Sequence, residues 1–170
     1  MAVIAARQIG KRANRRDWAV IARSVRRHMN TVERRKLLAE FKSVVMNWKH
    51  RPKFIAAMGD KGGDFVLSVR PAGKEAQKWR WVSQGTKGPY KIRAKNAKTL
   101  AFKTNYKPKT KPGYVFGGPG VATGDWRTPV EVTHPGIEPR NFEEHIGNRF
   151  APMFRERIEN LIRREIRKRK

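Results

Sequence analysis

Residues 79–102 read WRWVSQGTKGPYKIRAKNAKTLAF, and this stretch decides the expected fold. Trp79 and Trp81 stand two positions apart, and the aromatic enrichment around them is typical of a half-buried strand. Gly85 and Pro89 would end that strand, because glycine permits positive φ and proline lacks a ladder donor. Apolar residues after Pro89 predict returning strands, so we interpret the stretch as strands joined through a glycine turn.

The neighbouring segments extend this strand pattern into a sheet. Residues 54–58 and 65–69 are short apolar runs around a glycine-rich loop, which predicts a β-hairpin. Residues 130–133 give a last strand. No helix-length segment separates the strands between 54 and 102, which favours an antiparallel meander, either an open sheet or a partly closed barrel.

Helical periodicity flanks the sheet on both sides. Apolar residues recur every three or four positions in 17–50, where Asn30 and Glu33 resemble a capping pair and predict a break or bend. The same spacing returns in 139–170, where Pro152 predicts a kink or a restart close to it. We therefore expect an α+β fold with N-terminal helices and a long C-terminal helix packed on the sheet.

A chain of 170 residues has the usual length of one domain, and we predict a single domain over 1–170. Its expected parts are a basic N-terminal tail at 1–16, a helical segment at 17–50, a β-rich core at 53–138 with an extended loop at 103–129, and a C-terminal helix at 139–170.

The charge balance indicates a polyanionic neighbour. Lysine and arginine number 40 against 14 acidic residues, which gives a formal net charge of +26. Such an excess repels itself within one molecule and attracts nucleic acid, acidic protein surfaces or anionic lipid. The alternative is that the charge serves only solubility. The charge alone does not choose among these partners.

The loop at 103–129 alternates lysine with proline and carries several aromatic residues. A loop of this length is usually functional or disordered, and like charges with proline favour an extended cationic arm. Its large rings favour packing on a neighbouring subunit or on the sheet, with a mobile surface loop as the equal alternative. The residues expected to face DNA or a partner are Lys103, Lys107, Lys109, Lys111, Arg26, Arg27, Arg34, Arg35, Arg167, Lys168, Arg169 and Lys170. Those expected to dock between subunits are Tyr106, Tyr114, Phe116 and Trp126.

Catalytic patterns are missing from the sequence, and we predict no enzyme and no catalytic, cofactor or metal site. The chain contains no cysteine, which excludes a disulfide framework and thiolate chemistry. Asp60 and Asp64 flank a glycine loop and would be the metal ligands of a nuclease, but such aspartates are a common turn composition. The apolar run before Arg7 is too short for a signal peptide or a membrane span, so we expect a soluble protein that is not exported by that route. A helix-turn-helix interpretation of 17–50 is disfavoured, because Phe41 and Trp48 look like core residues.

One set of motifs resembles a known family. An aromatic-x-x-x-Gly-Thr turn, an apolar Leu-x-Phe segment and a His-Pro-Gly followed by Arg-x-Phe occur in order between 79 and 154. They resemble the minor tail or tail-completion proteins of tailed bacteriophages, which join head and tail at the neck. The motif residues, expected to act as scaffold, are Trp81, Gly85, Thr86, His134, Pro135, Gly136 and Phe142.

The resemblance implies a structural virion protein at the head-proximal end of the tail, assembled in the host cytoplasm. It implies a ring of six copies around the DNA channel, beside tail-tube, tail-terminator or connector proteins, with sequence-independent contact to double-stranded DNA and no membrane. Such a ring needs head-to-tail contacts that close, which extended arms and terminal helices can supply. The alternative is a free basic nucleic-acid-binding protein that compacts DNA or regulates its use.

Overall fold

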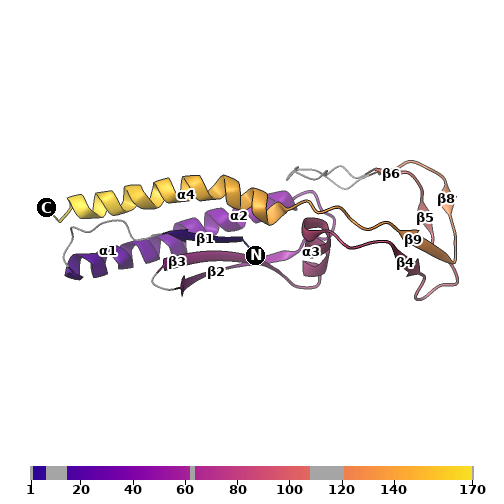
Figure 1. Ribbon diagram of the computed structural model, residues 1–170, viewed down its shortest axis with the longest axis horizontal. Helices are drawn as coiled ribbons and strands as arrows, with labels where there is room; N and C mark the ends of the chain where they lie inside the picture. Colours follow the sequence, from indigo (N-terminus) through magenta and orange to yellow (C-terminus); the bar gives the residue numbers. More distant parts are fainter. Residues whose placement is uncertain (1, 7–14, 62–63, 108–120, 170) are drawn as a thin grey trace. The chain divides into compact units, whose positions relative to one another are not determined.

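A computed structural model describes residues 2–6, 15–61, 64–107 and 121–169 (Figure 1). The chain divides into two compact units. The helical unit comprises Met1–Ser43, Phe54–Ala72 and Glu143–Lys170, and the ribbon unit comprises Val44–Lys53 and Gly73–Phe142. Two compact units can be halves of one domain or two domains, so the single-domain prediction stays a prediction. The α+β class, with N-terminal helices, small antiparallel sheets and a long C-terminal helix, is confirmed.

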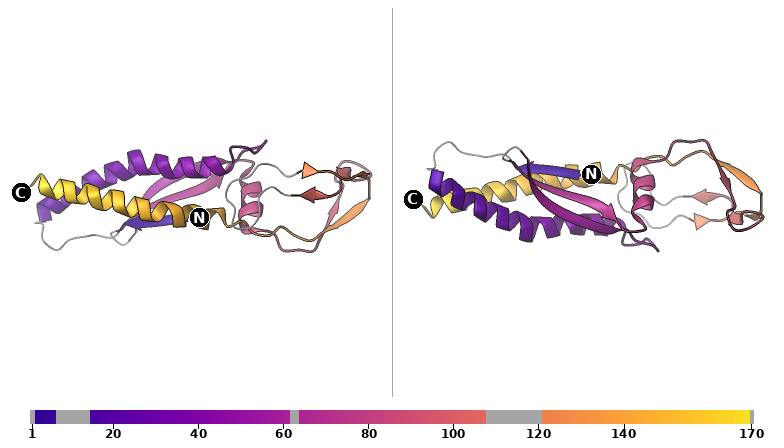
Figure 2. Two further views of the ribbon diagram at one scale, coloured as in Figure 1. Left: turned by 90° about the horizontal axis from the view of Figure 1, so that it is seen from above. Right: turned by 90° about the horizontal axis from the view of Figure 1, so that it is seen from below.

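The helical unit consists of helices and one three-stranded sheet. Its helices are α1 (Arg15–His28), the π-helix η1 (Met29–Glu33), α2 (Arg34–Val44) and α4 (Phe142–Arg167). Its strands are β1 (Ala2–Ala6), β2 (Lys53–Lys61) and β3 (Asp64–Ala72), in the order β1-β3-β2. Figure 2 shows α4 and the α1–α2 helix on the same side of this sheet.

The core of the helical unit consists of apolar residues from its helices and strands. Phe41 on α2 is fully buried and meets Phe54 of β2 edge to face, with ring centroids 5.4 Å apart. Leu67 and Val69 lie two positions apart on β3 and are both buried, as the period of a strand requires. The other buried apolar residues of this unit are Ile21, Val25, Met29, Leu37, Ile146, Phe150, Phe154, Ile158, Leu161 and Ile162.

Three local predictions for this unit need correction. The bend near Asn30 takes the form of the single π-helical turn η1, and no side chain caps its start, so the Asn30–Glu33 capping pair is wrong. The restart near Pro152 is also wrong, because α4 runs through Pro152 in one helix whose buried stripe continues on both sides. Within the segment predicted as a basic tail, Ala2–Ala6 form an edge strand that pairs antiparallel with β3. Pairing with a strand some sixty residues away leaves no local sequence signal.

The opening stretch of the sequence is a helix at its start, not a strand. α3 (Ala76–Gln84) contains both tryptophans, with Trp79 fully buried and Trp81 46% exposed. Helical geometry places Trp79 and Ser83 on one face, and both are buried. A Trp-x-Trp alternation is too short to distinguish a strand from a helix, and the preceding Ala-Gln-Lys run favours a helix.

The remaining strands form nested pairs instead of the predicted meander or barrel. β4 (Tyr90–Arg93) pairs with β9 (Glu131–His134), β5 (Phe102–Lys103) with β8 (Trp126–Arg127), and β6 (Tyr106–Lys107) with β7 (Val121–Ala122). All three pairs are antiparallel. The chain therefore runs out along β4, β5 and β6 and returns along β7, β8 and β9, and we call residues 86–107 and 121–137 the ribbon (Figure 1).

Ser83 joins α3 to the start of α4. Its carbonyl accepts hydrogen bonds from the backbone N–H groups of Arg140 and Asn141, at 3.1 and 2.8 Å. Its hydroxyl oxygen accepts a hydrogen bond of 3.1 Å from the N–H of Phe142, the first residue of α4. One buried serine thus satisfies polar groups at the end of one helix and the beginning of another, which would otherwise lack intrahelical partners.

Replacing Ser83 should destabilise the protein more than replacing an exposed serine. We expect Ser83→Ala to lower the free energy of unfolding by about 1–2 kcal/mol, because the buried N–H of Phe142 loses its acceptor. Urea denaturation followed by far-ultraviolet circular dichroism measures the change. Ser68→Ala is the matched control, since its hydroxyl makes only a 3.5 Å exposed bond to the carbonyl of Ala57. Equal losses in the two variants would contradict the role of Ser83.

Candidate functional site

The base of the ribbon is a close crossing of two backbone segments. Thr86 and Ile137 form a two-way bridge, with N to O distances of 2.9 and 3.3 Å, and the Thr86 hydroxyl also accepts from the Ile137 N–H at 2.9 Å. The residues that precede Thr86 and Ile137 must both be glycine. A Cβ on Gly85 would lie 2.5 Å from the carbonyl oxygen of Ile137, and a Cβ on Gly136 would lie 2.6 Å from the carbonyl oxygen of Thr86. Both glycines also have positive φ, of 76° and 105°.

Most of the motif residues therefore meet at this crossing. Thr86 lies against Gly136, and Gly85 lies against Ile137 and Pro139, although some fifty residues separate the two segments in the sequence. Two motif residues lie elsewhere in the ribbon unit. Phe142 is fully buried, with its ring centroid 5.1 Å from that of Trp79, and Trp81 is partly exposed on α3. The common position of the turn and the His-Pro-Gly motif gives them a shared structural role in anchoring the ribbon.

Cross-strand contacts hold the ribbon together above its base. Tyr90 and His134 stand opposite each other, with stacked rings 5.0 Å apart. Glu131 pairs with Lys91 at 2.8 Å and with Arg93 directly opposite. The hydrogen bonds from Lys91 and then Arg93 lower the pKa of the Glu131 carboxyl, and its bond raises the pKa of Lys91. Such pairs are the units that stabilise an otherwise marginal two-stranded ribbon.

The outer part of the ribbon exposes cations beside large apolar side chains. Lys103 places its ammonium 5.9 Å from the ring centroid of Trp126, the residue opposite it in the ladder. Trp126 is 65% exposed and Tyr106 62% exposed, so both rings remain largely in water. The exposed cations of the described ribbon are Lys87, Lys91, Arg93, Lys95, Lys98, Lys103, Lys107 and Arg127, against the acids Asp125 and Glu131. This composition suits a partner that is both anionic and able to cover rings.

The predicted cations of the helical unit differ in exposure and in the ion pairs and hydrogen bonds that they form. Arg26 forms an ion pair with Asp60 at 3.3 Å and lies over the ring of Phe65, and Arg35 donates to the Thr31 carbonyl. Lys168 and Arg169 pair with Glu165, at 3.0 and 3.1 Å. Arg27 and Arg167 are exposed, and Arg34 is half-buried. The predicted residues Lys109, Lys111, Tyr114, Phe116 and Lys170 lie outside the described residues.

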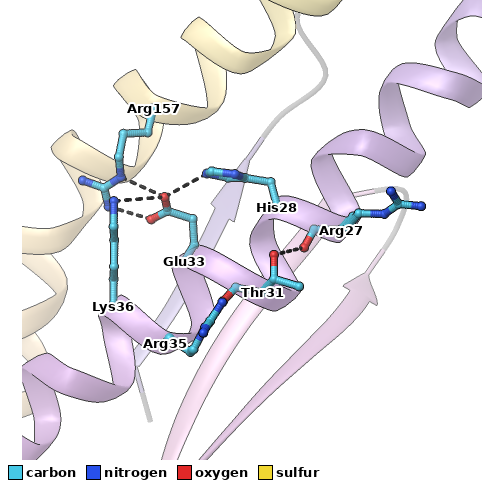
Figure 3. A network of polar contacts seen from close by, with 7 residues as sticks. All are labelled: Arg27, His28, Thr31, Glu33, Arg35, Lys36 and Arg157. Atoms are coloured by element: carbon cyan, nitrogen blue, oxygen red, sulfur yellow. Dashed lines mark hydrogen bonds and ion pairs between the residues drawn. The ribbon is translucent and has the colours of Figure 1, made fainter.

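A buried carboxylate in the helical unit escaped the sequence analysis (Figure 3). Glu33 of η1 is fully buried and receives two hydrogen bonds from Arg157 of α4, at 2.9 and 2.6 Å. His28 Nε2 lies 3.2 Å and Lys36 Nζ 3.9 Å from the same carboxylate. Its spacing could have revealed it, because Glu33 falls four residues from both Met29 and Leu37 on the buried stripe. The cluster ties α4 to the π-helical turn and is a structural feature.

The described residues offer little for metal chemistry or membrane insertion. Among them, no three histidine or acidic side chains gather in a way that could hold a metal ion. Asp60 is engaged by Arg26. None of the helices in the described ranges combines the length and apolar character needed to cross a bilayer.

Comparisons with protein families, with curated proteins and with solved structures found no match to this chain. The candidate site therefore rests on its own geometry: an anchored, cation-rich ribbon with exposed aromatic rings.

Proposed function

We propose that this chain is a structural component of a tailed-bacteriophage particle, acting in the neck or in tail completion. In this proposal several copies form a closed ring around the DNA channel, next to tail-tube, terminator or connector proteins. The ribbon carries the contact between subunits, and exposed lysine and arginine residues face the DNA. The chain has no catalytic part in this role.

The observation that carries the proposal is the exposure of large apolar side chains on the ribbon and beside its last strand. Besides Tyr106 and Trp126, the side chains of Val121 and Val130 are 50% and 68% exposed. Large apolar side chains left exposed are often covered by a protein partner. A ring made by repeating one head-to-tail contact presents such a segment to the next subunit in each copy.

The charge supports the DNA part of the proposal. A net charge of +26 would oppose assembly of several copies unless a polyanion compensated it. Duplex DNA supplies about one negative charge per 1.7 Å of its length and binds cations without regard to sequence. A free DNA-compacting or regulatory protein would use the same cations, so the two functions must be separated by experiment.

Affinity for duplex DNA as a function of salt separates them. We expect weak binding by the full chain, equal for unrelated sequences, with log K falling linearly with log salt concentration. Replacing Lys103, Lys107 and Arg127 by glutamine should reduce the slope by about 0.9 for each phosphate contact removed. Fluorescence anisotropy with labelled duplexes measures both quantities.

The control variant replaces Arg23, Lys42 and Lys49 by glutamine. These residues are also exposed, and the change in charge is the same. The control should retain more of the slope than the ribbon variant. Tight binding with a preference for one sequence would support the free nucleic-acid-binding protein in place of the structural role.

A further inference from the structure

A pocket of about 680 Å³ lies within the ribbon unit, next to the crossing at the base of the ribbon. Its walls include Val82, Thr86, Tyr106, His134, Ile137 and Arg140. This volume falls within the range of about 300–1,000 Å³ typical of sites for small molecules. The proposed neck function makes no use of the pocket.

Arg140 is the unusual residue in the wall of this pocket. It is only 7% exposed, yet its guanidinium has few compensating partners. One nitrogen, Nη1, donates to the Glu138 carbonyl at 3.1 Å, whereas Nε has no hydrogen-bond partner within the part of the chain that the structure describes. The carboxylate of Glu138 lies 3.9 Å away, and its side chain is 80% exposed. A buried cation with five N–H donors and one weak ion pair is costly unless an anion joins it.

His134 adds a second polar group to the pocket. Its Nδ1 accepts a hydrogen bond of 3.0 Å from the Gly136 N–H, which assigns the proton of the neutral ring to Nε2. The Nε2–H group is then a donor. Val82, Pro135 and Ile137 give part of the wall an apolar character, and Thr86, Tyr106 and Glu138 also line it. The Arg140 guanidinium, this donor and the apolar residues of the wall together suit a planar anion attached to an apolar body.

We propose that this pocket binds a carboxylate group carried by an apolar body, with Arg140 as its principal partner. The planar guanidinium fork matches the two oxygens of a carboxylate. A phosphate group fits less well, because its greater charge would stand beside Glu138 and apolar walls. The carboxylate can belong to a free small molecule or to the last residue of a peptide. The inference does not depend on the proposed function.

Titration of the isotopically labelled full chain with small probes, followed by nuclear magnetic resonance at constant ionic strength, tests the inference. Benzoate is the probe, and benzamide is its neutral counterpart of the same shape. We expect benzoate to bind at least about tenfold more tightly, because charge-assisted hydrogen bonds are stronger than neutral ones. The largest shifts should fall on the backbone amides of Thr86, Gly136, Ile137, Glu138 and Arg140. N-acetyl-alanyl-phenylalanine and its C-terminal amide test whether the bound carboxylate belongs to a peptide. A peptide site would bind the free acid of this dipeptide more tightly than it binds benzoate.

Two variants test the role assigned to Arg140. Arg140→Gln should remove the preference for benzoate over benzamide. Because this change is in a buried residue, Glu138→Gln gives an independent test on an exposed one: it removes the competing carboxylate and should tighten benzoate binding about two- to threefold. Equal affinity for benzoate and benzamide, shifts spread over the surface, or no effect of Glu138→Gln would each overturn the inference. A tenfold preference for phenyl phosphate over benzoate would overturn it in favour of a phosphate site.

Discussion

Trp79→Ala is expected to lower the free energy of unfolding by about 3–5 kcal/mol, the range found when a buried aromatic ring is removed. Trp79 is fully buried in the ribbon unit. Its ring centroid lies 5.1 Å from that of Phe142 and 6.4 Å from that of Trp48, so removing it leaves a cavity beside these two aromatic side chains. Urea denaturation monitored by circular dichroism measures the loss.

Trp81→Ala is the matched control and should cost less than about 1 kcal/mol, because Trp81 is 46% exposed. The pair also distinguishes the helix from the strand that the sequence predicts. In a strand Trp79 and Trp81 would share a face and respond alike, whereas in α3 they point to different faces. Similar losses for the two variants would contradict the helical assignment.

Arg157→Met is expected to cost about 3 kcal/mol. The substitution leaves the carboxylate of Glu33 fully buried without the arginine that donates two hydrogen bonds to it. Breaking a buried ion pair usually costs about 3–5 kcal/mol, and we expect the lower end because the Arg157 side chain is 28% exposed. The same denaturation experiment measures the change.

Arg149→Met on the same helix provides the control. Arg149 pairs with Glu40 of α2, but both side chains are substantially exposed, and the loss should stay below about 1 kcal/mol. A double variant that also replaces Glu33 by methionine should recover most of the stability, since it removes the unpaired charge. A loss for Arg157→Met no larger than that for Arg149→Met would contradict the structural role of the buried cluster.

The elements with a long periodic pattern of apolar residues were predictable from the sequence. The stripes of α1–α2 and α4 continue over many turns, and their period identifies a helix without knowledge of any partner. The apolar runs around Gly62 and Gly63 likewise predict β2 and β3. The short helix α3 was not predictable in this way, because the two tryptophans that suggested a strand occupy too few positions to define a period.

Features that depend on distant pairing were not predictable. The partner of Tyr90 is His134, and no local pattern distinguishes such nested pairs from a meander of neighbouring strands. Glu33 looked like a capping residue because its buried partner, Arg157, follows more than a hundred positions later. In the candidate site, the exposed cations and rings of the ribbon were visible as composition. The pocket beside Arg140 needed the crossing of two separate segments.

The motif residues gain a physical explanation from the crossing at the base of the ribbon. Gly85 and Gly136 are needed there for space and for positive φ, and Thr86 fixes the register against Ile137. These residues therefore hold the ribbon in place, and Lys103 and Trp126 of the β5–β8 pair are exposed.

The most direct test of the proposed neck role is to prepare virus particles from an infection in which this chain is not produced, and to examine them by electron microscopy and for infectivity. The proposal predicts DNA-filled heads and separate tails that fail to join, with infectivity restored when the full chain is supplied. Joined, infectious particles in the absence of the chain would contradict it.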